Sequence, residues 1–122
     1  MIYTGIDIIE IDRVVRVKNI YKERFLKKIY TLNEIKYCRN RGPQLASRFA
    51  AKEAMMKTLG TGIRGIPWKS IEVVRKRGQA PKILLHGPAK SKANELKIKY
   101  IALSLSHSNN LAVASVVAET KS

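Results

Sequence analysis

The segment "PQLASRFAAKEAMMKTL", residues 43–59, contains the strongest helix signal of the chain. Pro43 suits the first turn of a helix, where a missing N–H breaks no hydrogen bond, and Gly60 is a natural stop at the other end. Apolar residues recur along it at spacings of three and four, and these are Leu45, Phe49, Met56 and Leu59. We therefore predict a long helix over 43–59 with an apolar stripe that packs in the core.

Strands are predicted at both ends of the chain. Residues 2–11 form a short apolar run rich in β-branched side chains, which favours a strand buried on both faces. Residues 100–107 alternate apolar with small side chains, and residues 109–119 return after a turn at 106–110. Strands at both ends with helices between them indicate an α+β domain, in which the long helix packs on a mostly antiparallel sheet.

Shorter elements are expected between these parts. The sequence "TLNE" at 31–34 is a capping box, because the Thr31 hydroxyl and the Glu34 carboxylate can each accept a backbone N–H of the first helical turn. The expected ranges are 13–30, 31–41 and 87–97 for helices, and 71–77 and 82–86 for two strands joined around Gly78.

Length and composition set the broad class. A chain of 122 residues is expected to form one domain over 1–122. Cys38 is the only cysteine, which excludes an intramolecular disulfide and a cysteine-based zinc site. No apolar run approaches the length of a membrane span, and the N-terminus lacks the pattern of a signal peptide. We expect a cytoplasmic protein without a membrane partner.

Charge is the strongest global signal. Twenty-four Lys and Arg residues against nine Asp and Glu residues give a formal net charge of +15. Residues 13–41 and residues 64–99 each hold ten basic and two acidic side chains. Such a field attracts nucleic acid, phosphorylated small molecules or an acidic protein, and composition alone puts nucleic acid first.

Two acidic residues occupy positions where apolar ones are expected. Asp7 lies in "GIDIIEI", residues 5–11, among isoleucines, and Glu53 lies on the apolar stripe of the helix over 43–59. A partly buried carboxylate is costly unless it is paired or binds a metal. One interpretation is that core cations neutralise both acids, with Arg48 and Lys52 the nearest. The other is that both acids share a hard cation such as Mg²⁺ with waters and substrate phosphate oxygens.

Cations flank the helical acid. Lys57 follows Glu53 by one turn and Arg48 precedes it by a little over one turn, an arrangement that suits a metal-bridged diphosphate. Lys57 is equally placed for an ordinary i,i+4 ion pair. The glycines of "GTG" at 60–62 either cap the helix or let backbone amides approach a phosphate. His107 ends a strand at the predicted hairpin, where a histidine serves either structure or ligand binding.

These residues, in this order, resemble the holo-acyl-carrier-protein synthase family, the short bacterial type of 4′-phosphopantetheinyl transferase. The resemblance covers about Gly5 to Val117. Its motifs are "GIDIIEI", "TLNEIKYC", "RFAAKEAMMKTLGTG", "WKSIEV", "GQAPKILLHGPA" and "SLSHSNNLAVASVV". It implies the 4′-phosphopantetheinyl transferase fold and transfer of 4′-phosphopantetheine from coenzyme A to a serine of apo-acyl carrier protein. The reaction releases adenosine 3′,5′-bisphosphate and supports fatty acid biosynthesis.

The resemblance also implies roles for single residues. Asp7 and Glu53 match the Mg²⁺ ligands, and Glu53, directly or through a metal-bound water, is the candidate base for the serine hydroxyl. Lys57 and His107 are expected to stabilise the leaving phosphate. The positions that match coenzyme A binding are Arg48, Lys57, Gly60, Thr61, Gly62 and His107.

The resemblance gives the positive charge a partner. Family members dock acidic acyl carrier proteins on a basic first helix, and Arg13, Arg24 and Phe25 match the docking positions. Family members are homotrimers with an active site at each subunit interface. The basic cluster over 64–99 keeps no assigned role.

Two rival functions explain less of the sequence. A nucleic-acid-binding domain would use the charge, but the chain has no zinc pattern or RNP-type aromatic motif, and Asp7 and Glu53 would have no purpose. A different nucleotide-binding transferase on the same scaffold would use the two acids but not the full motif set.

Overall fold

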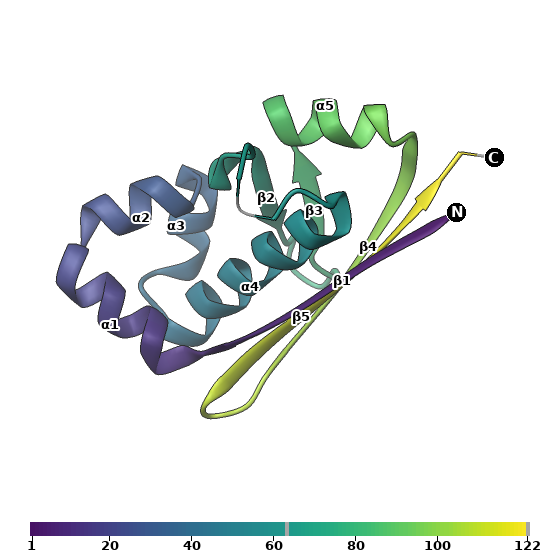
Figure 1. The fold of residues 1–122 in the computed structure, drawn as a ribbon. Coiled ribbons are helices and arrows are strands. Elements are labelled where there is room, and N and C mark those ends of the chain that lie inside the picture. Colours follow the sequence, from purple (N-terminus) through teal and green to yellow (C-terminus); the bar gives the residue numbers. More distant parts are fainter. Residues whose placement is uncertain (63, 122) are drawn as a thin grey trace.

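The computed structural model describes residues 1–62 and 64–121, and its longest helix, α4, lies across one face of a three-stranded antiparallel sheet (Figure 1). The strand order in this sheet is β1-β5-β4, and β2 and β3 form a separate antiparallel pair. The elements are β1 (Ile2–Glu10), α1 (Ile11–Tyr21), α2 (Glu23–Ile29), α3 (Leu32–Cys38), α4 (Gly42–Leu59), the 3₁₀ turn η1 (Trp68–Ser70), β2 (Ile71–Val74), β3 (Lys82–Leu85), α5 (Gly87–Glu95), β4 (Ile98–His107) and β5 (Leu111–Thr120). The predicted α+β architecture, with the long helix on an antiparallel sheet, is confirmed.

Helix α4 is the centre of the molecule. Pro43 lies in its first turn and Gly60, with a φ of 77°, ends it, so the predicted helix over 43–59 is confirmed. The burial is wider than a stripe, because four alanines on its other faces are also fully buried; these are Ala46, Ala50, Ala51 and Ala54. Their small side chains let neighbouring elements approach α4 on several sides. Within the described part of the chain, no helix is both long and apolar enough to cross a membrane.

Gly5 sets the distance between β1 and α4. A Cβ placed at Gly5 would overlap the carbonyl oxygen of Ala54 and would lie 2.5 Å from Oγ1 of Thr58. Only glycine therefore fits where these two backbones meet. The close approach also brings Asp7, two residues further along β1, against the same helix.

The outer face of the three-stranded sheet is uncovered. Side chains of β1 alternate between the two faces, and Ile6 and Ile8 remain 62% and 61% exposed. The strand was predicted to be buried on both faces, which is wrong for the single chain because α4 covers only one of them. Val117 on the neighbouring strand β5 is also exposed on this side. An apolar face of this kind is typical of a protein–protein interface.

Several predicted boundaries are wrong, and the reasons are local backbone geometry. The expected helix over 13–30 is two helices, because Lys22 adopts a φ of 48° between α1 and α2. Helix α3 ends at Cys38 because Arg39 and Asn40 are left-handed, although its capping box at Thr31 is present as predicted.

The strand boundaries also differ by a few residues. Strand β2 ends at Val74 rather than 77, because residues 75–81 form the loop to β3. Strand β4 begins at Ile98 rather than 100, and a register shift follows between Ile98 and Tyr100. The other elements differ from the predicted ranges by one or two residues at an end.

A buried ion pair links α3, α4 and β2. Lys52 and Glu34 are both fully buried, with Nζ of Lys52 2.8 Å from Oε1 of Glu34. Lys52 also donates to the carbonyls of Trp68 and Ile71, and Oε2 of Glu34 accepts the backbone N–H of Val73 at 2.8 Å. Each charge is thus surrounded by hydrogen-bond partners, as a buried charge requires.

Candidate active site

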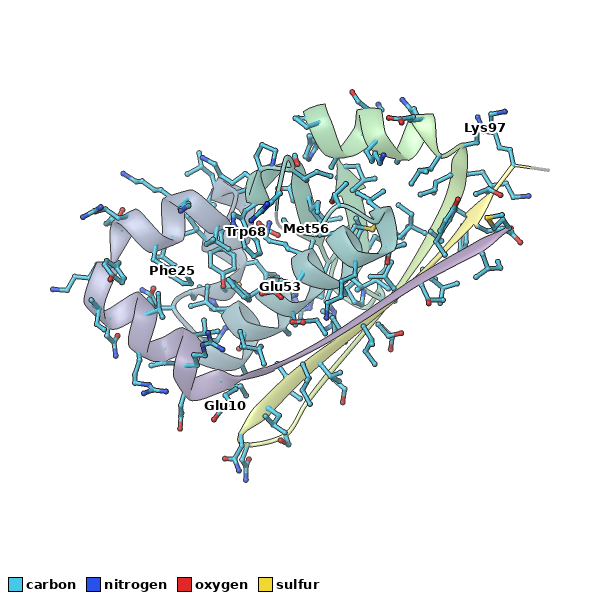
Figure 2. The ribbon with its side chains drawn as sticks, viewed as in Figure 1. Glu10, Phe25, Glu53, Met56, Trp68 and Lys97 are labelled. Atoms are coloured by element: carbon cyan, nitrogen blue, oxygen red, sulfur yellow. The ribbon has the colours of Figure 1, made fainter. Side chains whose placement is uncertain are left out.

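Asp7 and Glu53 meet where β1 packs on α4. The side chain of Asp7 faces the helix and is 11% exposed, and Glu53 is half-buried between α4 and α1 (Figure 2). Burial and the negative charge of Asp7 raise the pKa of Glu53, against the opposing effect of Lys57 and Arg13. The two acids therefore share one site, as the metal hypothesis requires.

Lys57 joins this pair from the next turn of α4. Its Nζ lies 3.1 Å from Oδ1 of Asp7 and donates to the carbonyl of Ile6 at 2.9 Å. Its ion partner is thus across the helix–strand contact, not Glu53 at i−4. Two carboxylates and one ammonium form the carboxylate–lysine cluster, which we define as Asp7, Glu53 and Lys57.

Arg48 and Lys52 do not neutralise the two acids. Lys52 pairs with Glu34, and Arg48 contacts Oγ of Ser47 at 3.0 Å and stacks over the Tyr37 ring. The interpretation that these two cations balance Asp7 and Glu53 is therefore wrong. Among the described residues, Glu53 takes part in no ion pair.

The carboxylate–lysine cluster fits Mg²⁺ better than a metal that needs several protein ligands. No group of three or more His, Cys, Asp or Glu side chains occurs in residues 1–62 and 64–121. Mg²⁺ is usually held by one or two carboxylates with waters and substrate phosphates, whereas structural zinc takes four protein ligands. Burial and the charge of Asp7 raise the pKa of Glu53, and a bound divalent cation would offset both effects.

A small cavity connects Glu53 with two of the predicted docking residues. The cavity has a volume of about 180 Å³, and Arg13, Phe25 and Glu53 all line it. Phe25 stacks on Phe49, and its side chain lies between α2 and α4 (Figure 2). The predicted basic first helix is divided, since Arg13 is on α1 while Arg24 and Phe25 are on α2.

A second cavity, of about 310 Å³, contains the predicted coenzyme A ligands Arg48 and His107. We call it the arginine cavity, and its lining residues are Tyr37, Gln44, Ser47, Arg48, Arg75, Pro81, Leu105 and His107. Arg48 is only 4% exposed, and its buried Nε has no hydrogen-bond partner among the described residues. The guanidinium groups of Arg48 and Arg75 make the cavity suited to an anion.

The two sites lie on different sides of α4. Arg48 precedes Glu53 by five residues, which is a rotation of about 140° around a helix. One chain thus brings Asp7, Glu53 and Lys57 together and, separately, Arg48 and His107. Sequence reasoning missed Arg75, whose only signal was its place in the basic cluster over 64–99.

The "GTG" segment ends α4 one turn after Lys57. Gly60 and Gly62 have φ values of 77° and 60°, and the backbone N–H of Thr61 donates to the carbonyl of Met56 at 3.2 Å. The helix-capping role of the first glycine is therefore present. Thr61 also lines a cavity of about 290 Å³ that Arg64 and Lys92 share.

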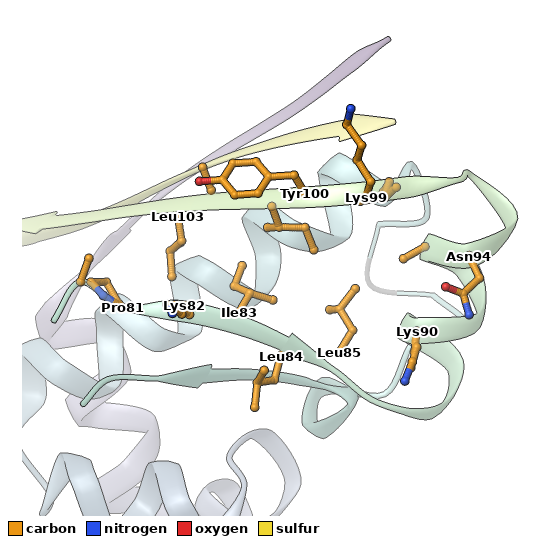
Figure 3. Close-up of a pocket in the computed structure, with 15 residues that line it drawn as sticks. Pro81, Lys82, Ile83, Leu84, Leu85, Lys90, Asn94, Lys99, Tyr100 and Leu103 are labelled. Carbon is orange, nitrogen blue, oxygen red and sulfur yellow. The ribbon is translucent and has the colours of Figure 1, made fainter. Parts of the chain in front are cut away.

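A further hollow contains none of the predicted site residues. It has a volume of about 580 Å³ and lies between β3 and β4, which run close without pairing (Figure 3). Ile83, Leu85 and Leu103 point into it, whereas Lys90 and Lys99 point away from its centre (Figure 3). It therefore has no part in the site predicted from the sequence.

Comparison with known proteins gives the family. The pattern of the 4′-phosphopantetheinyl transferase superfamily matches residues 3–116. A holo-acyl-carrier-protein synthase of Herpetosiphon aurantiacus is 42% identical over 124 residues, which cover 96% of this chain and 98% of the relative. The chain belongs to the holo-acyl-carrier-protein synthase family.

Solved structures of this family share the fold. The holo-acyl-carrier-protein synthase of Neisseria meningitidis superposes with a TM-score of 0.87 at 35% identity, over 98% of this chain and 100% of its own. The holo-acyl-carrier-protein synthase of Helicobacter pylori, solved in complex with coenzyme A, superposes with a TM-score of 0.86 at 32% identity. The match covers 95% of this chain and 99% of that one. The family resemblance and the predicted fold are thereby confirmed. Membership of the holo-acyl-carrier-protein synthase family favours the transferase interpretation over a nucleic-acid-binding domain.

Proposed function

We propose that this chain transfers 4′-phosphopantetheine from coenzyme A to a serine hydroxyl of apo-acyl carrier protein. The observation that supports it is the meeting of Asp7, Glu53 and Lys57 beside a cavity lined by the expected docking residues. The products are holo-acyl carrier protein, which serves fatty acid biosynthesis, and adenosine 3′,5′-bisphosphate. A buried free Cys38 suits a reducing compartment such as the cytoplasm.

The side chains divide the chemistry between them. Asp7 and Glu53 would hold Mg²⁺, which when bound neutralises the diphosphate charge of coenzyme A. Glu53 would take the serine proton as the serine oxygen attacks the β-phosphorus. The bond from that phosphorus to the bridging oxygen breaks, and its electron pair leaves with the nucleotide. Lys57 donates to the leaving phosphate, where negative charge increases.

We also propose a homotrimer of one-domain subunits, with active sites between them. The exposed apolar residues Ile6, Ile8 and Val117 give the outer sheet face the character of an interface. A neighbouring subunit would bring its Arg48 and His107 to the carboxylate–lysine cluster, which these residues do not join within one chain. Coenzyme A would then be bound by two subunits at once.

The carrier protein is expected at α1 and α2. Arg13 and Arg24 are exposed, and the cavity beside Phe25 can take an apolar side chain of the partner. An acidic protein would pair with the arginines while its serine approaches Glu53. Positive charge steers the encounter and fixes the orientation of the two proteins.

A mass-gain assay tests the proposed reaction. The wild-type protein with coenzyme A, Mg²⁺ and apo-acyl carrier protein should add one phosphopantetheine arm per carrier and release an equal amount of adenosine 3′,5′-bisphosphate. Asp7→Ala and Glu53→Gln, compared across a Mg²⁺ titration, should lose most of this turnover. Glu95→Gln, which changes an exposed carboxylate on α5, is the matched control. Absence of mass gain with the wild type would refute the reaction, and full turnover in both variants would refute the metal site.

A further inference from the structure

The loop between β2 and β3 brings a second guanidinium group to the arginine cavity. Arg75 is the first residue of this loop and Pro81 is the last, and both line the cavity with Arg48 and His107. The loop is a built turn, because Gly78 has a φ of 78° and the backbone N–H of Gln79 donates to the carbonyl of Lys76 at 2.9 Å. Arg75 is therefore presented at the cavity by a defined loop conformation.

The guanidinium of Arg75 is held across that turn. Its Nε donates to the carbonyl of Gln79 at 3.1 Å, which uses one of its five N–H donors. Its terminal nitrogens carry the donors that form paired hydrogen bonds to a phosphate. Because the anchor is a backbone carbonyl of the same loop, this hydrogen bond favours one orientation of the exposed side chain.

The charge of the arginine cavity selects a particular kind of anion. Two guanidinium groups and one imidazole line it, and no carboxylate of the described residues does. A cavity with these groups needs no metal to bind a phosphate dianion.

Coenzyme A offers two phosphate groups, and the chain offers two different sites. The diphosphate suits the carboxylate–lysine cluster, because two carboxylates would repel a phosphate that came without a bridging cation. The remaining group is the 3′-phosphate, a monoester dianion, which matches the metal-free arginine cavity. Resting on the function proposed above, we propose that Arg75 is a specificity-determining residue that recognises the 3′-phosphate of coenzyme A and selects it over 3′-dephospho-coenzyme A.

The same loop supplies a matched control. Arg77 has the same side chain and charge and lies two residues away, but it does not line the arginine cavity. Arg75→Gln and Arg77→Gln thus remove the same charge from the same loop, but only Arg75→Gln removes a contact with the cavity, together with the hydrogen bond to the Gln79 carbonyl. Arg75→Lys keeps the charge but loses the planar pair of donors.

Steady-state kinetics with the two substrates test the proposal. Arg75→Gln should lower kcat/KM for coenzyme A by about 10- to 100-fold, the range for one charge-assisted phosphate contact, and leave that for 3′-dephospho-coenzyme A within about twofold. Arg75→Lys should recover part of the loss. Arg77→Gln should change kcat/KM only slightly, and equally for the two substrates. Equal losses for both substrates in Arg75→Gln, or the same selectivity change in Arg77→Gln, would overturn it.

A binding measurement separates this proposal from the proposed reaction. Calorimetry should show that Arg75→Gln lowers the affinity for adenosine 3′,5′-bisphosphate by at least about tenfold. The affinity for adenosine 5′-monophosphate should not change. This result is independent of carrier-protein transfer, so a wild type without transferase activity would refute the reaction alone. A thermal unfolding midpoint equal to that of the wild type verifies that the variant is folded. Unchanged affinity for the bisphosphate in a folded variant would refute the role of Arg75.

Discussion

At the scale of single residues, Gly5 is the most constrained position near the proposed active site. Gly5→Ala should lower the free energy of unfolding by about 1–3 kcal/mol, because the added methyl group meets the carbonyl of Ala54 and Oγ1 of Thr58. Urea denaturation measures the loss. The double variant Gly5→Ala/Thr58→Ala should recover only a part, since the Ala54 carbonyl belongs to the backbone. Full recovery in the double variant would show that the hydroxyl, not the backbone, requires glycine here.

Glu72 is a residue whose effect on stability depends on pH. Burial raises the pKa of its carboxyl group, but hydrogen bonds from Thr31 at 2.6 Å and His86 at 3.0 Å outweigh burial and lower the pKa below its ordinary value of 4.5. A lowered pKa in the folded state means that the ionised group stabilises the fold above the unfolded value. This contribution is lost as pH falls through the folded pKa.

The corresponding prediction compares wild type with Glu72→Gln. The variant should be less stable by about 1–2 kcal/mol at neutral pH, and the difference should shrink below about pH 4 as the wild-type carboxyl group is protonated. Urea denaturation over a pH series measures it. Glu95→Gln removes an exposed carboxylate and should show a small difference at every pH. A difference for Glu72→Gln that persists at pH 2 would contradict the hydrogen-bonding account.

At the scale of elements, the sequence predicted the helix ends that depend only on neighbouring residues. Helix α4 and the capping box at Thr31 follow from proline, glycine and hydroxyl preferences, and both are present. The break at Lys22 had no such signal, because a lysine in a left-handed conformation is set by how α1 and α2 pack. Asp7 and Glu53 could be predicted as site residues from the sequence, because each is an acid in an apolar segment. The inclusion of Arg75 in the arginine cavity could not be predicted, since it depends on where the β2–β3 loop packs.

The buried pair Lys52–Glu34 should act as one unit that fixes α3, α4 and β2. Lys52→Met alone should cost about 3–5 kcal/mol, because it leaves the buried Glu34 carboxylate without its cation. Adding Glu34→Gln should recover part of that loss by removing the unpaired charge. A double-mutant cycle by denaturant unfolding measures the coupling between the two positions. Strictly additive losses would show that the two side chains act independently.

At the scale of the whole molecule, the net charge of +15 should govern use of the carrier protein. The Debye length falls from roughly 10 Å at 0.1 M salt to 3 Å at 1 M, so exposed arginines lose their attraction for an acidic partner. Salt should therefore raise KM for apo-acyl carrier protein far more than KM for coenzyme A. Arg24→Gln should reduce this salt dependence. Equal sensitivity of the two substrates would contradict docking on α1 and α2.

Subunit complementation tests whether two chains build each active site. Glu53→Gln damages the carboxylate–lysine cluster and Arg48→Gln damages the arginine cavity, so each variant alone should have low turnover. When equal amounts of the two variants are refolded together, about one quarter of all interfaces would combine an intact cluster from one subunit with an intact cavity from its neighbour. Turnover should then rise toward that fraction of wild type. Light scattering verifies the trimers, and mixed trimers without any recovered activity would place both sites in the same chain.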